Sequence, residues 1–116
     1  MEILFLLKKK SMKKRKVWVL EVSWNLNDEH DSDIYLFSSL TKAQTKMSEC
    51  IKEDFLCSVL TRFEYFEYKD SDNNYIRNKV PYEIFINDPI KSKYAMLYSD
   101  YSNDYISYII SKMSIK

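Results

Sequence analysis

The carboxylates and tyrosines of this chain are the side chains whose types and spacing point to a chemical role. The acidic residues fall into three groups along the chain: Asp28, Glu29, Asp31 and Asp33; Glu64, Glu67, Asp70 and Asp72; and Asp100 and Asp104. Tyrosines are interleaved with the last two groups: Tyr65, Tyr68, Tyr98, Tyr101 and Tyr105. Tyrosine beside carboxylate on a rigid sheet is typical of a surface that meets a basic protein.

We therefore expect a partner-binding surface that draws on all three groups. Its candidate residues are Asp28, Glu29, Asp31, Asp33, Glu64, Glu67, Tyr98, Asp100, Tyr101, Asp104 and Tyr105. A coding bias, together with the preference of tyrosine for strands, explains the same pattern without any partner. Stacking of RNA bases on the tyrosines is a third interpretation, and the negative charge of this part of the chain argues against it.

Two further chemistries of the carboxylates have simpler explanations. Residues 25–33 hold enough oxygen ligands for a divalent cation, but they lack the spacing and the central glycine of an EF-hand. A solvated hairpin loop explains them equally well. Glu64 and Glu67 are close enough in sequence for acid–base work, yet exposed charges on a strand give the same spacing. We predict no metal site and no catalytic residue.

The absence of glycine excludes several enzyme classes. The phosphate-binding loop, the dinucleotide fingerprint and the nucleophile elbow all require glycine, and the chain has none. His30 is the only histidine, and Cys50 and Cys57 are expected on the core side of a helix, so neither a Cys–His pair nor a zinc site is expected. We expect reduced thiols, no cofactor and no enzymatic activity.

The charge of the chain is unevenly distributed. Formal charge is +1, but seven of the 18 basic residues lie in residues 8–16, so residues 17–116 carry 11 basic and 16 acidic groups. We expect a basic N-terminal extension over 1–16 and a single domain over 17–116. The extension either contacts phosphate or is a solvated leader. The apolar run 3–7 is too short for a signal peptide or a span, which favours the cytoplasm and no membrane.

One helix is expected over residues 40–55. Its apolar residues recur at intervals of three and four and define one face: Leu40, Ala43, Met47, Cys50, Ile51 and Phe55. Ser38 or Ser39 is a suitable N-cap, and a capping box of Thr41 and Gln44 is an alternative start.

The remaining residues alternate or cluster as strands and loops. Strands are expected at 17–24, 34–37, 63–68, 82–86, 94–98 and 105–115, with Tyr75-Ile76 ambiguous and a helix as the alternative for the last. Loops or turns are expected at 25–33, 69–74 and 99–104, and those that need a positive φ must use Asn or Asp. Trp18, Leu20, Val22 and Trp24 share one face and should meet the helix.

These elements define a fold class. Short connections between consecutive strands favour antiparallel pairing. We predict an α+β, two-layer domain: an antiparallel sheet of five or six strands with one main helix packed on one face, in the order β-β-α-β-β-β-β.

The strand–strand–helix segment resembles small proteins of bacteriophages and mobile elements of AT-rich bacteria. The resemblance is carried by Val17–Trp24 and by the run Phe37-Ser38-Ser39-Leu40-Thr41-Lys42-Ala43-Gln44, and it covers about 40 residues. It implies a compact accessory protein. Some of that group, anti-CRISPR proteins among them, block host defence by occluding a basic nucleic-acid-binding surface, so the host cytoplasm is implied as well. No site residue follows from it.

These observations lead to three functional hypotheses. The first is a non-enzymatic protein-binding module, as in phage-type anti-defence inhibitors, that covers a basic surface of a nucleic-acid-binding host enzyme. The second is an immunity protein or antitoxin-like antagonist of a toxin. The third is a small-ligand-binding sensor, which a deep polar pocket would favour. Direct nucleic-acid binding is not expected except through the basic extension.

Overall fold

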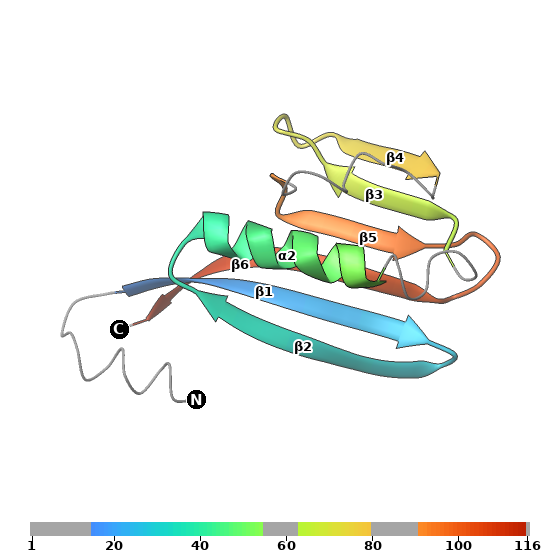
Figure 1. Cartoon of the computed structure of the whole chain (residues 1–116), viewed down its shortest axis with the longest axis horizontal. Coiled ribbons are helices and arrows are strands. Elements are labelled where there is room, and N and C mark those ends of the chain that lie inside the picture. Colours follow the sequence, from blue (N-terminus) through green and yellow to red (C-terminus); the bar gives the residue numbers. More distant parts are fainter. Residues whose placement is uncertain (1–14, 55–62, 80–90, 116) are drawn as a thin grey trace.

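The computed structural model describes residues 15–54, 63–79 and 91–115. Within them the elements follow the order β1 (Arg15–Leu26), β2 (Glu29–Phe37), α2 (Leu40–Asp54), β3 (Tyr65–Lys69), β4 (Tyr75–Lys79), β5 (Tyr94–Tyr98) and β6 (Tyr105–Ile115) (Figure 1). The α+β class and the order β-β-α-β-β-β-β are therefore confirmed for the described residues. The strand expected at 82–86 lies outside them.

All strands belong to one sheet in the order β2-β1-β6-β5-β3-β4, and every neighbouring pair is antiparallel. The last strand, β6, enters the middle of the sheet beside the first, β1, along a register that runs from Arg15↔Ile115 to Asn25↔Tyr105. This pairing joins the two halves of the sequence. Residues near 27 and residues near 104 therefore lie at the same end of the sheet, where β1 ends and β6 begins.

The prediction of a loop at 25–33 is wrong, because these residues form the end of β1, a tight turn and the start of β2. The ladder continues to Leu26↔Glu29, which leaves only Asn27 and Asp28 as the turn. Their φ angles are 55° and 65°, the left-handed values that a two-residue type I′ turn requires. Residues 29–33 are exposed. An exposed edge strand needs no apolar alternation, and that absence of alternation suggested a loop.

Asn and Asp take the positive φ angles that glycine would otherwise adopt, as expected for a chain without glycine. The described residues with positive φ are Asn27, Asp28 and Asn73, residue types that tolerate the left-handed region. The ambiguous Tyr75-Ile76 begins β4, which continues to Lys79, and residues 105–115 form a strand and not a helix. Strand β3 begins two residues later than expected, at Tyr65, and includes Lys69.

Helix α2 starts at a serine cap. The Ser39 hydroxyl accepts a hydrogen bond from the Lys42 amide at 3.2 Å, and the Ser39 carbonyl accepts one from the Ala43 amide at 3.2 Å. Ser39 is therefore the N-cap, and the alternative capping box is not used. The spacing of the apolar residues correctly predicted the buried face: Ala43, Met47, Cys50 and Ile51 are all buried.

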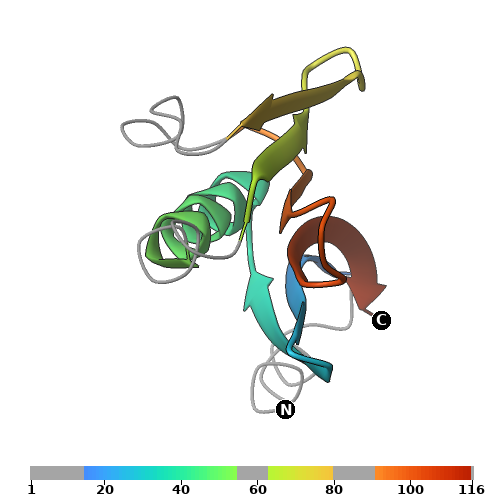
Figure 2. The ribbon, with the colours of Figure 1, turned by 90° about the vertical axis from the view of Figure 1, so that its right-hand side faces the viewer.

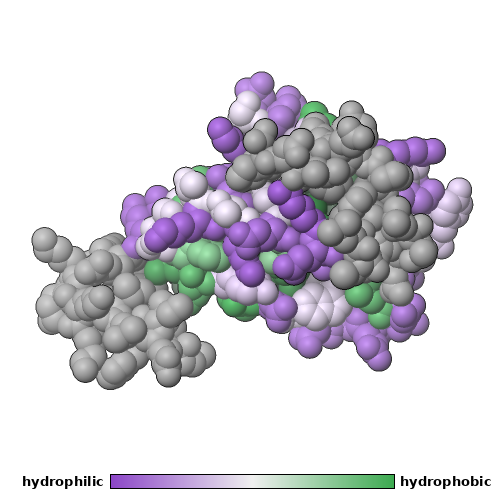
Figure 3. Space-filling view, viewed as in Figure 1, coloured by the Kyte–Doolittle hydropathy of each residue, from purple (hydrophilic) through white to green (hydrophobic). Residues whose placement is uncertain are grey.

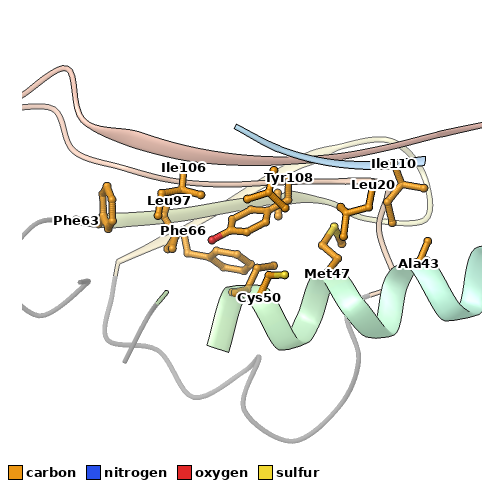
Figure 4. Close-up of a cluster of buried hydrophobic side chains, with 13 residues drawn as sticks. Leu20, Ala43, Met47, Cys50, Phe63, Phe66, Leu97, Ile106, Tyr108 and Ile110 are labelled. Atoms are coloured by element: carbon orange, nitrogen blue, oxygen red, sulfur yellow. The ribbon is translucent and has the colours of Figure 1, made fainter. Parts of the chain in front are cut away.

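The core forms where this helix face meets the sheet. Met47 and Ile51 belong to one buried cluster with Leu20, Val22 and Tyr108 (Figure 4). The cluster continues through Phe66, Ala95, Leu97, Ile106 and Ile110, and Trp18, Trp24 and Leu40 pack against it. Figure 2 shows α2 lying beside the sheet. In the described part of the chain, no helix combines the length and the apolar character that a membrane span requires.

Candidate functional site

The β1–β2 hairpin and the β5–β6 loop meet at one end of the sheet, where their strands end or begin. Because β1 ends where its partner β6 begins, Asn27 and Asp104 come into contact, and the Asn27 amide donates a hydrogen bond to Asp104 Oδ1 at 3.0 Å. Asn25 Nδ2 donates to the Asn103 carbonyl at 2.9 Å, and the Asn25 side chain is buried. These two bonds bring the hairpin turn against the β5–β6 loop, and we call this end of the sheet, which carries Asp28, Glu29, Asp100 and Asp104, the acidic end.

Glu64 contributes to the acidic end by ordering its loop. One carboxylate oxygen, Oε1, accepts from the Ser99 hydroxyl at 2.8 Å and from the Asp100 amide at 3.1 Å. The Glu64 amide in turn donates to the Tyr98 carbonyl at 3.0 Å. Glu64 was predicted as a partner-binding residue, but in the structure its carboxylate is already engaged as an acceptor for the loop.

Asp28, Glu29 and Tyr101 are the most available members of the candidate surface. All three are exposed, and Tyr101 retains 87% of its accessible surface. Within the described residues, neither Asp28 nor Glu29 has a hydrogen-bond or ion-pair partner for its side chain. Tyr101 lies between Asp100 and Asp104 in the loop that the hairpin supports, whereas Tyr105 is half-buried at the start of β6.

A second group of predicted residues lies on the side of the sheet opposite α2. Phe66 and Leu97 are buried in the core, so the alternating positions Glu67 and Tyr98 point away from the helix. Glu67 accepts hydrogen bonds from the hydroxyls of Tyr94 at 2.7 Å and Tyr98 at 3.3 Å. Burial, and after it the adjacent Glu67 carboxylate, raises the pKa of Tyr94 and of Tyr98.

Arg77 connects this tyrosine cluster to the acidic end. Its guanidinium carbon lies 3.6 Å from the ring centre of Tyr65 and 5.6 Å from that of Tyr98. The same group forms an ion pair with Asp100, with 2.9 Å between nitrogen and oxygen. The charge of Asp100 is therefore partly balanced, and Arg77 was not singled out from sequence because its partners lie on other strands.

Asp31 and Asp33 take the opposite direction. They pair with Trp24 and Val22 across the hairpin, and paired residues share a face, so both carboxylates lie on the side of α2. Asp33 lines a cavity of about 260 Å³ with Glu53 and Asp54 of the helix and with the aromatic side chains Trp24 and Tyr35. The predicted acidic group at 28–33 is thus divided between the acidic end, which has Asp28 and Glu29, and the α2 side of the hairpin, where Asp33 lines the cavity.

Asp54 is a half-buried carboxylate that sequence reasoning missed. It accepts a hydrogen bond of 2.6 Å from the hydroxyl of Tyr108, which is buried in the core. Burial raises the pKa of Asp54, and the bond from Tyr108 opposes that rise. The signal was present: position 54 lies three residues after Ile51 and four after Cys50, so it continues the apolar face of α2.

The group formed by Glu64, Glu67, Asp70 and Asp72 is not kept together. Asp70 and Asp72 lie in the β3–β4 turn, at the end of the sheet opposite the acidic end. Asp70 Oδ1 accepts from the amides of Asp72 and Asn74, each at 2.9 Å, so it shapes the turn.

Metal and thiol chemistry have little support in the geometry. Among the described residues no three His, Cys, Asp or Glu side chains are arranged to hold a metal ion. Burial raises the pKa of the Cys50 thiol to about 11, so it is protonated at neutral pH. His30 pairs with Asn25 and therefore lies on the face opposite α2 and Cys50. Cys57 lies outside the described residues.

Neither protein-family models, nor curated proteins, nor solved structures match this chain.

Proposed function

We propose that this chain is a non-enzymatic protein-binding module whose acidic end binds a basic surface of a partner protein. The observation that carries the proposal is the junction of hairpin and loop, where Asn27 binds Asp104 and Asn25 binds Asn103. The acidic end carries exposed carboxylates from the hairpin and from the β5–β6 loop, and the same loop carries the exposed Tyr101.

The acidic end is suited to binding because it is preorganised. A two-residue turn and the Glu64 acceptor hold the loop, so little conformational entropy is lost when a partner docks. A concentration of negative charge on such an edge accelerates the encounter with a positive surface and disfavours negatively charged partners. Tyrosine is among the residues that most often carry binding energy at the centre of an interface.

The proposal rests on a two-layer arrangement in which α2 supports one face of the sheet. The tyrosine cluster on the opposite face, with Glu67 and Arg77, then extends the acidic end into a larger surface. The partner class we propose is a nucleic-acid-binding enzyme of host defence, whose basic groove the acidic end would cover in the host cytoplasm. This is the mode of action implied by the resemblance to small phage proteins.

The test is binding of the purified full chain to a panel of purified RNA-guided nucleases, other defence nucleases and basic toxins at low salt. We expect one nuclease of the panel to bind, nucleic acid to compete, and the affinity to fall as salt increases. The double variant Asp28→Asn/Glu29→Gln should bind about five- to tenfold more weakly, since two charges that only face solvent are removed.

The matched control is Asp72→Asn, which removes a carboxylate from the other end of the sheet and should leave the affinity unchanged. If no panel member binds, or if the double variant and the control bind equally well, the proposed site is wrong. If only a toxin binds, and nucleic acid does not compete, the partner is a toxin and this chain is an immunity protein.

A further inference from the structure

A cavity of about 260 Å³ lies between the helix and the hairpin, beside the acidic end. Its apolar and aromatic walls come mainly from Trp24 and Leu26 of β1 and Tyr35 of β2. Its carboxylates come from Asp33 of β2 and from Glu53 and Asp54 of α2. In the view of Figure 3, green and pale residues appear beneath the purple surface of the helix, on the side where the hairpin lies.

In the part of the chain that the structure describes, the carboxylates of the cavity form no ion pair with a cation of the chain, although the Lys46 ammonium lies near Tyr35 in the cavity wall. Within the described residues, Asp33 and Glu53 have no hydrogen-bond or ion-pair partner for their side chains, while Asp54 is held by the Tyr108 hydroxyl at 2.6 Å. After burial, the charges of Glu53 and Asp33 contribute to raising the pKa of Asp54, because three like charges surround one space. A positive group in the cavity would remove this repulsion.

The aromatic walls suit the same kind of group. Tyr35 already has a cation over its ring, since the Lys46 ammonium lies 5.0 Å from the ring centre. Aromatic faces attract ammonium and guanidinium groups, and the attraction is stronger where water is excluded. The volume is slightly below the roughly 300 Å³ at which sites for drug-sized ligands begin, so the space fits a group of side-chain size.

We propose that this cavity binds an organic cation, an alkylammonium or guanidinium group on an apolar stem. The stem contacts Trp24 and Leu26, and the charge faces Asp33 and Glu53. If the proposed function holds, the source is a lysine or arginine side chain on the basic surface of the partner. A free amine of the same chemistry is the other source, and the cavity does not require the partner in order to bind it.

The first experiment uses small probes and the full chain in the absence of a partner. ¹⁵N-labelled protein is titrated with n-butylammonium and with N-acetyl-arginine methylamide, and n-butanol is the neutral control. We expect both cations, but not the alcohol, to shift the indole N–H resonance of Trp24. The Asp33→Asn/Glu53→Gln variant should bind the cations about tenfold more weakly, while Asp72→Asn binds as the parent chain does.

The proposal is overturned if Trp24 does not respond, if n-butanol binds as well as n-butylammonium, or if the double variant binds the cations unchanged. Thermal unfolding of both variants accompanies the titrations, because a loss of fold would show as a lowered midpoint. An alkyl-chain series from methyl- to hexylammonium then measures the stem contact, and affinity should increase with chain length until the cavity is filled.

The second experiment separates this proposal from the proposed function. The two double variants, Asp33→Asn/Glu53→Gln and Asp28→Asn/Glu29→Gln, are compared for binding to a partner found in the panel. Weaker binding by both supports a partner side chain in the cavity. The cavity is assigned to a free amine if only Asp28→Asn/Glu29→Gln binds the partner more weakly while Asp33→Asn/Glu53→Gln no longer binds the cation probes. Binding of the probes with no partner in the panel retains the cavity and removes the proposed function.

Discussion

The two ends of the sheet connect their strands without glycine, but they use their acidic groups differently. At the acidic end Asp28 and Glu29 face solvent, and the turn is formed by the backbone of Asn27 and Asp28. At the opposite end, which we call the lysine end, Asp70 accepts two amides and Asn73 takes the left-handed φ of 64°. At the acidic end Asp104 and Glu64 also accept backbone amides, but Asp28 and Glu29 remain available there.

The same contrast extends to the surroundings of each end. A second cavity, of about 650 Å³, lies at the lysine end, and its charged lining residues are Lys69, Lys91, Lys93 and Asp70. The cavity near the acidic end is lined by three carboxylates. The two cavities therefore differ in charge, with three lysines and one carboxylate at the lysine end and three carboxylates near the acidic end. Each end also has a side-chain hydroxyl that is held inside the fold and that acts as an anchor.

The anchors differ in charge. Near the acidic end, the Tyr108 hydroxyl donates to the carboxylate of Asp54. At the lysine end, the neutral Ser92 hydroxyl donates to the Tyr94 carbonyl at 2.7 Å and accepts from the amides of Tyr94 at 3.1 Å and Lys69 at 3.3 Å. The two anchors can be broken separately, and the expected losses differ in size and in pH dependence.

The largest effect is expected from Tyr108→Phe. The change leaves the partly buried Asp54 carboxylate without its donor, and an unsatisfied charged group costs about 2–3 kcal/mol. Urea unfolding at neutral pH measures the loss. Tyr68→Phe is the control, since within the described residues no hydrogen bond of the Tyr68 hydroxyl is present, and it should stay within about 0.5 kcal/mol. Equal losses of stability in the two variants would show that the hydrogen bond from Tyr108 to Asp54 does not stabilise the fold.

A smaller loss is expected from Ser92→Ala. The variant removes one donor and one acceptor that serve the backbone of β3 and β5, at a cost of about 1–2 kcal/mol. Because a hydroxyl does not titrate between pH 4 and 8, this loss should be the same across that range. A loss that changes with pH would show that the lysine end contains a titrating anchor too. The control is Ser111→Ala, whose parent side chain is exposed on β6.

The pH dependence of stability should identify Asp54. Burial raises its pKa in the folded chain above the ordinary 3.8, so the folded state binds a proton that the unfolded state has lost. The contribution of this group is therefore fully present below pH 3.8 and is lost as pH increases through the raised pKa. Asp54→Asn should remove that loss, and the difference from the parent chain should grow from acidic to neutral pH in urea unfolding. A constant difference would contradict the assignment.

The smallest effect is expected at the hairpin turn. Asp28→Gly replaces a residue at φ 65° with one that adopts this region at no steric cost, and Asn-Gly is the favoured type I′ pair. We expect a gain of about 0.5–1 kcal/mol in stability together with weaker partner binding. Asp28→Ala is the matched control, because alanine also removes the charge but is strained at positive φ and should lower stability.

The element types followed from local patterns in the sequence. The face of α2 from Ala43 to Ile51, the serine cap and the strand at 94–98 were all visible, because side-chain period and capping depend on neighbours in sequence. The hairpin was missed for the opposite reason. Edge strand β2 is exposed over 29–33, so burial imposed no alternation on it, and the polar run was interpreted as a loop.

The candidate site divided along the same line. Sequence identified Asp28, Glu29, Asp100 and Asp104 as one kind of residue, but it gave no reason for them to meet. The pairing of β6 with β1 brings the two segments that carry them to the same end of the sheet, and the alternation along the strands decides that Asp33 turns towards α2 while Glu67 turns away. These are pairings between distant segments, and they carry no local signal.

The sequence alone therefore determined the α+β class and the order of the elements, the buried face of the helix and the use of Asn and Asp where glycine is absent, whereas it left β4 and β6 ambiguous and missed the first half of β2. Only the tertiary structure decided which carboxylates are free, which hold the backbone and which surround a cavity. The physical reason is that propensity and period act over a few residues, whereas the charge of a surface depends on strands that pair across the whole chain.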